Sequence, residues 1–491
     1  MSSSVLNRRV SRAVAIHIAA ALLAVLCFAQ AEAADLTWGG IYRIEANQIT
    51  NPSLNSAKTN KAYILHHLIL NPKIIAADGV TIYSRLDVLN GSGINANGRV
   101  DNVAGETIGG GPNSTRVGSD TTSGTGGNTS NTTTRTQSAG TVAVTQLYVS
   151  WVQEYGQFVA GRSPVHFGLG TAWNAGNGLF DHFIDTKDMV GYKVILGNLY
   201  FMPILGKVNE GNISEEDDVN DYALHLQYEN PETELALGFL YQVRVATFAG
   251  NDLPLTTPLG GGDIAGRTVA RRDGSKTNLM GIFSTQKVGN FRIGVEADML
   301  NGDTGYTSNG AGVSIDSIGV AAEIAYVNKE SKLTGDLKFG FATGDDPNTP
   351  EKYEGYAFSR NYDVAMLMFN QPLGQRDFLR TGLVRGSTAS RTNDIDTEAI
   401  SNVIYIAPSL QYQFKENFSY GGTFAFGMLN KDKYVNAAGA VETTQKTLGY
   451  EIDLNLTYRP YARFTWITSA GFLLPGDAWK GSTAENLENK F

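Results

Sequence analysis

The residues that could take part in chemistry are mostly charged side chains placed at every second position. Arg43 precedes Glu45 by two residues, and Asp336 stands in the same relation to Lys338. In an extended strand, residues i and i+2 lie on one face. Opposite charges on that face attract each other along a strand and across to its neighbour. These pairs predict a solvated polar face held by ion pairs.

Histidine, cysteine and acidic residues do not form a recognisable catalytic or metal-binding motif. His166, His182 and His225 are isolated, and the only cysteine is Cys27. The acidic run at 215–218 could bind Ca²⁺, but it lacks the EF-hand spacing, so a solvated acidic loop is the alternative. We therefore expect no enzyme, no metal and no cofactor, although Ser, His and Asp residues can also meet only in space.

The clearest structural signal is a hairpin at 141–169. Leu147, Val149 and Trp151 alternate with polar residues, and a second alternating run follows a turn at 155–157. Alternation with a period of two indicates strands with one apolar and one polar face. A transmembrane β-barrel and a soluble β-sandwich both contain such hairpins, so this segment alone does not distinguish them.

Short turns and long polar loops alternate along the rest of the chain. Turns at 78–79, 197–198 and 289–290 are followed by loops such as 91–140, 209–221, 301–313 and 343–399. Outer-membrane barrels have short turns at one end and long loops at the other. The sequence therefore predicts an all-β, transmembrane, antiparallel up-and-down β-barrel of about 16–18 strands, with short periplasmic turns and long extracellular loops. Residues 482–491 are either the last strand or a tail.

The N-terminus predicts export. Arg8, Arg9 and Arg12 precede an apolar run that ends at a small-residue cleavage motif, Ala31-Glu32-Ala33. We expect a signal peptide at 1–33 and an outer-membrane barrel at 34–491. Removing residues 1–33 takes away three Arg and one Glu, which changes the formal charge from −9 to −11. This acidic balance argues against a nucleic-acid partner.

Assigning the polar face of each strand inward predicts the residues that line the pore. They are Arg43, Arg85, Asp87, Arg162, His166, Arg244, Arg292, Glu296, Asp336, Lys338, Arg459 and Arg463. Their signs are mixed, so a wall held by ion pairs and an anion-selective ring of arginines are both open. The segment 170–189 is a predicted constriction loop, with Trp173, Phe180, Asp181, Asp185 and Lys187. Its aromatic residues could instead anchor the rim in the membrane interface.

Several segments give the chain a resemblance to a known family. These are the Gly161-Arg162 strand, the loop AWNAGNGLFDHFIDTKDMVG at 172–191 and the segment FSRNYDVAMLMFNQPLG at 358–374. They resemble outer-membrane porins related to alginate export proteins. The resemblance implies a monomeric barrel of about 18 strands that conducts an anionic polysaccharide through a constriction lined by arginines. The balanced charges of the predicted wall depart from that pattern.

The expected function is passive diffusion of small hydrophilic or anionic solutes through an outer-membrane porin, with alginate-like polysaccharide passage as the finer expectation. The alternatives are an outer-membrane barrel enzyme and an adhesive or structural barrel closed by its loops. The apolar run at 364–369 would plug the barrel or form an extra hairpin. Expected partners are the lipid bilayer, small solutes and the barrel-assembly machinery, which would bind through Phe491.

Overall fold

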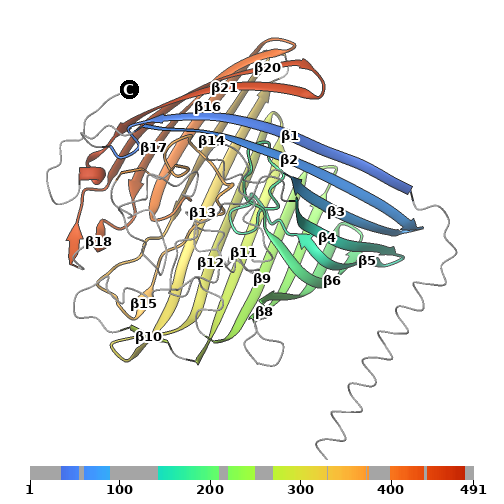
Figure 1. The fold of residues 1–491 in the computed structure, drawn as a ribbon, viewed down its shortest axis with the longest axis horizontal. Coiled ribbons are helices and arrows are strands. Elements are labelled where there is room, and N and C mark those ends of the chain that lie inside the picture. The colour runs from blue at the N-terminus through green and yellow to red at the C-terminus, as the bar shows by residue number, and fades with distance from the viewer. Residues whose placement is uncertain are drawn as a thin grey trace, which may run out of the picture.

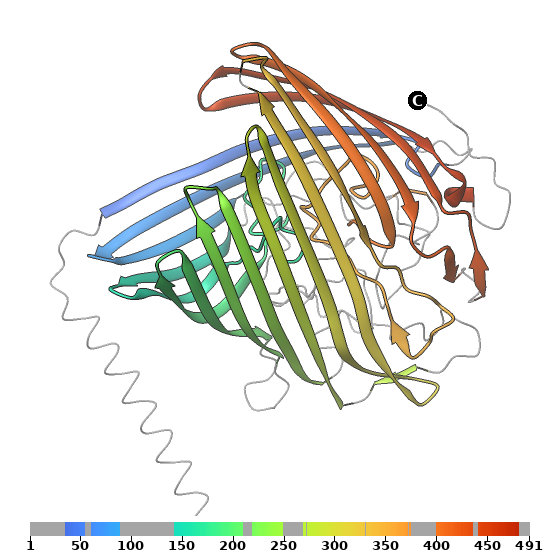
Figure 2. The same ribbon diagram turned by 180° about the vertical axis from the view of Figure 1, so that it is seen from behind.

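The computed structural model is built almost entirely of antiparallel strands. It describes residues 35–54, 60–88, 142–209, 219–248, 269–271, 273–328, 330–371, 373–374, 399–435 and 440–480. The predicted signal peptide, the loop at 91–140, the acidic run at 215–218 and the segment 482–491 lie outside these residues. In the described part, one sheet of 19 strands runs around a central space (Figures 1 and 2). The prediction of an all-β protein with a large antiparallel sheet is confirmed.

Seventeen of the 19 strands are long. The first nine are β1 (Asp35–Thr50), β2 (Asn60–Ala77), β3 (Val80–Val88), β4 (Val142–Gln153), β5 (Gly156–Pro164), β6 (Thr186–Leu196), β7 (Leu199–Asn209), β8 (Val219–Asn230) and β9 (Leu235–Phe248). The others are β11 (Asp273–Val288), β12 (Phe291–Ser308), β13 (Ala311–Asn328), β14 (Leu333–Ala342), β16 (Val403–Lys415), β17 (Phe418–Leu429), β20 (Thr447–Tyr461) and β21 (Phe464–Pro475).

The remaining elements are short pieces near the long-loop end. The sheet also contains β10 (Val269–Arg271) and β15 (Lys352–Tyr353). A separate two-stranded sheet consists of β18 (Lys433–Val435) and β19 (Val441–Thr443), and a 3₁₀ helix, η2 (Asp477–Lys480), follows β21. None of the helices among the described residues is long and apolar enough to cross a membrane.

One connection differs from the sequence prediction. The expected long loop at 301–313 is a continuation of β12 and β13, which pair as far as Ser308 and Ala311. The turn between them is Asn309-Gly310, with positive φ angles of 50° and 84°. Asn-Gly favours two-residue hairpin turns because both residues tolerate positive φ. The polar residues before the turn obscured a strand pattern that this dipeptide could have revealed.

The outward face of the sheet is apolar. Leu147 is 52% exposed and Leu205 is 61% exposed, and both project away from the central space. Tyr155, Tyr461 and Phe464 are exposed at the short-turn end. An apolar band with aromatic residues at its borders is typical of strands that face lipid.

The sheet has two free edges among the described strands. β1 pairs only with β2, and β21 pairs only with β20. Since the 17 long strands alternate in direction, β1 and β21 run the same way. This odd number differs from the even number expected for a closed antiparallel barrel.

Candidate channel lumen

The inward face of the sheet carries charged residues that are buried rather than bathed in water. Arg85, Asp87, Arg244 and Glu296 are at most 5% exposed. Two inward-folded segments cover them. We call residues 165–185, between β5 and β6, the first coil, and residues 343–371, after β14, the second coil. The first coil is visible in green inside the ring of strands (Figure 1).

The first coil is fixed to β12 through its backbone amides. Glu296 accepts hydrogen bonds from the N–H groups of Leu169, Gly170 and Ala172, the last two at 3.0 and 3.2 Å. The Thr171 hydroxyl donates to Asp298 at 2.6 Å. Glu296 and Asp298 are two residues apart on one strand, so both reach the same face. The pair therefore acts as a docking point for a turn of the coil.

A second anchor holds the coil near β6, β8 and β9. Trp173 is 1% exposed, and its indole N–H donates to Gln242 at 3.1 Å. Lys187 lies 4.5 Å from the centre of the Trp173 ring. Lys187 and Arg244 both pair with Asp221, at 2.8 and 2.6 Å. The ion-pair network thus supports the indole ring that closes this side of the lumen.

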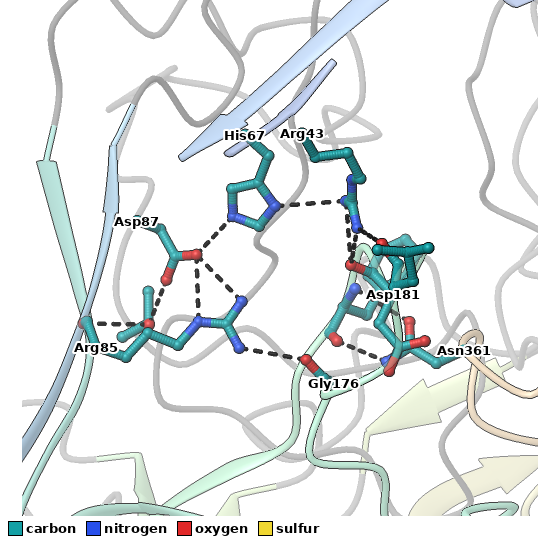
Figure 3. Close-up of polar contacts among 10 residues, drawn as sticks. Arg43, His67, Arg85, Asp87, Gly176, Asp181 and Asn361 are labelled. Carbon is teal, nitrogen blue, oxygen red and sulfur yellow. Dashed lines mark hydrogen bonds and ion pairs between the residues drawn. The ribbon is translucent and has the colours of Figure 1, made fainter. Parts of the chain in front are cut away.

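The arginines of β1 and β3 hold the far side of the coil (Figure 3). Arg85 donates to the Gly176 carbonyl at 3.3 Å, and Arg43 donates to the Leu179 and Asp181 carbonyls at 2.6 and 3.2 Å. These side chains therefore bind the coil backbone.

Acidic partners fix the two arginines in place. Arg85 pairs with Asp87 at 3.2 Å, and the Asp87 carboxylate also lies 2.6 Å from His67. Arg43 pairs with Glu45 at 2.5 Å, and Glu45 in turn pairs with His182 of the coil at 2.9 Å. The arrangement favours the ion-paired wall over an arginine ring open to solvent.

The second coil is held on β20 in the same way, by hydrogen bonds from its backbone N–H groups to two acidic side chains. Glu451 accepts hydrogen bonds from the N–H groups of Leu367 and Met368, at 2.6 and 2.7 Å. Asp453 accepts one from the N–H of Met366 at 3.1 Å. Val364, Met368 and Phe369 are buried, so the apolar run at 364–369 occupies part of the lumen and forms no hairpin.

The two coils also contact each other. The Ser359 N–H donates to the Thr171 carbonyl at 2.7 Å. The Asn361 amide donates to the Phe183 carbonyl at 2.6 Å and accepts from the Phe183 N–H at 3.1 Å. The coils therefore form one connected body inside the sheet.

A cavity of about 850 Å³ lies beside the free edges. Residues of β1, β14, β16, β17, β20, β21 and the tips of both coils line it. Its cationic lining is Arg43, Lys338 and Arg463, and its acidic lining is Glu45, Asp363 and Asp453. Phe180, 49% exposed, projects from the tip of the first coil into this space. The lining is thus balanced in charge.

The other predicted wall residues are scattered. Arg292 lies at the short-turn end, where it pairs with Glu234 at 3.0 Å. Asp336 is half-buried two residues from Lys338, which pairs with Glu323 at 3.4 Å. Arg459 and Arg463 are exposed near the turn between β20 and β21. His166 is in the first coil, near the Ala175 N–H at 3.5 Å.

Arg162 lies on the outward face, which the sequence did not predict. It pairs in register with Leu147, and directly opposite residues share a face of the sheet. The turn after β4 pairs Trp151 with Phe158, so the even-numbered residues of β5 face outward and Val159 is buried. A shift of one residue reverses the faces of a strand. Pairing Trp151 with Phe158 across the turn would have predicted that Arg162 faces outward.

Within the described residues, no group of three or more His, Cys, Asp or Glu side chains is arranged to hold a metal ion. The described contacts of His67 do not include a hydroxyl group that it could activate. Its partners are Asp87 and Arg43, and the Thr145 hydroxyl donates to Asp87 instead of to the imidazole.

Comparisons with known proteins find similar structures only. No family model and no curated protein sequence matches the chain. Pseudomonas aeruginosa OccK9 (OpdG) is similar with a TM-score of 0.47 and 11% identity, over 92% of this chain and 95% of that one. P. aeruginosa OccK1 (OpdK) gives 0.45 and 11%, over 91% and 95%. In-vitro-folded OmpT of Vibrio cholerae gives 0.40 and 9%, over 91% and 99%.

Asp185 makes the docking of the first coil sensitive to pH. Burial raises the pKa of its carboxyl to about 7, although the Asn174 N–H donates to it at 2.6 Å. Because the folded pKa exceeds the unfolded one, the contribution of Asp185 to stability is present in acid and is lost as the pH rises toward 7. We expect backbone amides of the coil, corrected for intrinsic exchange, to exchange faster at pH 8 than at pH 5.

The Asp185→Asn variant is the control, because a side-chain amide does not ionise between pH 5 and pH 8. The difference between wild type and variant in hydrogen–deuterium exchange should be small at pH 5 and large at pH 8, with the variant better protected. An equal pH response in the two proteins would contradict the role of Asp185.

Proposed function

We propose that the protein is an outer-membrane channel through which small hydrophilic solutes diffuse. The observation that carries this proposal is the combination of an apolar outward face with a charged inward face that surrounds two docked coils. Lipid explains the apolar outward face. The inward charges anchor the two coils and line the cavity beside them. An exported precursor with residues 1–33 as its signal peptide would reach that membrane, where the barrel-assembly machinery would insert it.

The size and charge of the cavity indicate the class of solute. A space of about 850 Å³ is comparable with sites for single small molecules, which occupy about 300–1,000 Å³. Its three cationic and three acidic side chains favour neither ion sign strongly. We do not extend the proposal to an alginate-like polysaccharide, because an anionic polymer would need a wider and more cationic passage.

A barrel closed by its loops is the second candidate, and the docked coils favour it. Both coils are joined to the wall and to each other by short hydrogen bonds. If they stay in place, the barrel would conduct little and would serve a structural or adhesive role. Conductance separates the two candidates.

The channel proposal predicts the behaviour of a Glu296→Leu variant. Leucine fills the space but cannot accept the three N–H groups of the first coil. Each unsatisfied N–H costs about 1–3 kcal/mol, so the undocked population should rise by about tenfold or more. We expect larger and noisier single-channel currents in planar bilayers than those of the wild type.

Glu234→Leu is the matched control, because Glu234 lies at the short-turn end, where it pairs with Lys287 and Arg292. Its currents should equal those of the wild type. Conductance that appears only in Glu296→Leu would favour the closed barrel, and no conductance in any folded variant would contradict the channel.

A further inference from the structure

A row of polar residues crosses four strands on the outward face, close to the long-loop end. Arg162 of β5 is opposite Asp188 of β6, and Asp188 is opposite Lys207 of β7. Asn220 of β8 continues the row beside Lys207. Each lies within three residues of the end of its strand. In strands that face lipid, such a level corresponds to the lipid headgroups.

The next outward row toward the middle of the strands is apolar. Val190 is opposite Leu205, and Leu205 is opposite Tyr222. Their side chains are 48%, 61% and 50% exposed. The register thus places a sharp boundary between charged and apolar residues on the outward surface, two residues apart on each strand.

A hollow of about 520 Å³ lies across this boundary. Arg162, Asp188 and Lys207 line its polar part, and Val190, Leu205 and Tyr222 line its apolar part. Gly161 and Gly206 also line it through their backbone.

We propose that this hollow binds an anionic membrane lipid, with the phosphate at Arg162 and Lys207 and an acyl chain along Val190, Leu205 and Tyr222. The inference rests on the proposed function only in that the outward face meets lipid. Arg162 and Lys207 are the cations among the residues that line the hollow, and Asp188 is the carboxylate. Basic residues beside a membrane attract anionic headgroups.

The ion pair of Arg162 prepares it for this role. Asp188 accepts from Nε and Nη2 at 2.7 and 2.8 Å, which fixes the plane of the guanidinium group. A guanidinium has five N–H donors, so this two-pronged contact leaves others for a phosphate. Arg162 and Asp188 are 28% and 39% exposed at their side chains, so a headgroup can reach them.

The test is lipid binding by the full chain in detergent micelles, measured by native mass spectrometry with phosphatidylglycerol and phosphatidylcholine. We expect tighter binding of phosphatidylglycerol. Arg162→Gln with Lys207→Gln should weaken it by about 25-fold, at about fivefold for each cation. Asp188→Asn should strengthen it. Arg292→Gln, at the opposite end, is the matched control and should bind as the wild type does.

Three results would overturn the proposal. They are equal binding of the two lipids, equal binding by the double variant and the wild type, and displacement of the lipid by millimolar inorganic phosphate, which would indicate a simple anion site. The single-channel conductance of Arg162→Gln should match that of the wild type, because the side chain faces away from the lumen. This readout separates failure of the lipid site from failure of the channel.

Discussion

The interior of this protein depends on carboxyl groups of the strands that accept hydrogen bonds from inward-folded coils. The donors are backbone N–H groups and, at Asp298, the Thr171 hydroxyl. Glu296 and Asp298 on β12 hold one coil, and Glu451 and Asp453 on β20 hold the other. In both cases a Glu-x-Asp pair on a strand presents two acceptors to the same face. Without such acceptors, the N–H groups of an irregular coil would be buried unsatisfied, which is costly.

This constraint changes what the charges of the lumen do. Arg43 and Arg85 would form part of a selectivity ring if they faced open water, yet they donate to carbonyl groups of the first coil. The coils, rather than the strands, then determine the width of the remaining passage. On the channel proposal, passage would then be selected by size and by the balanced charges that line the cavity, because Arg43 and Arg85 are already engaged.

Alternation of residue types predicted the sheet well, since a strand with one face in lipid has an apolar residue at every second position. The segment 170–189 was predicted to fold inward, and residues 165–185 do lie inside the sheet, but Lys187 belongs to β6. Its role as a constriction stays a prediction. The residues that anchor this segment could not be predicted from the sequence, because Gly170 and Glu296 are 126 residues apart in the chain. Arg162 was misplaced for a local reason: the turn before β5 sets the register, and one residue reverses the face.

The most direct test of the central claim is the size limit for solute entry into liposomes that contain the wild-type protein. Liposome swelling with neutral sugars of increasing length measures it. If two docked coils leave a cavity of about 850 Å³ as the passage, monosaccharides should enter quickly and longer oligosaccharides should be excluded. Equally rapid entry of long oligosaccharides would contradict the account, because the coils could not then occupy the lumen.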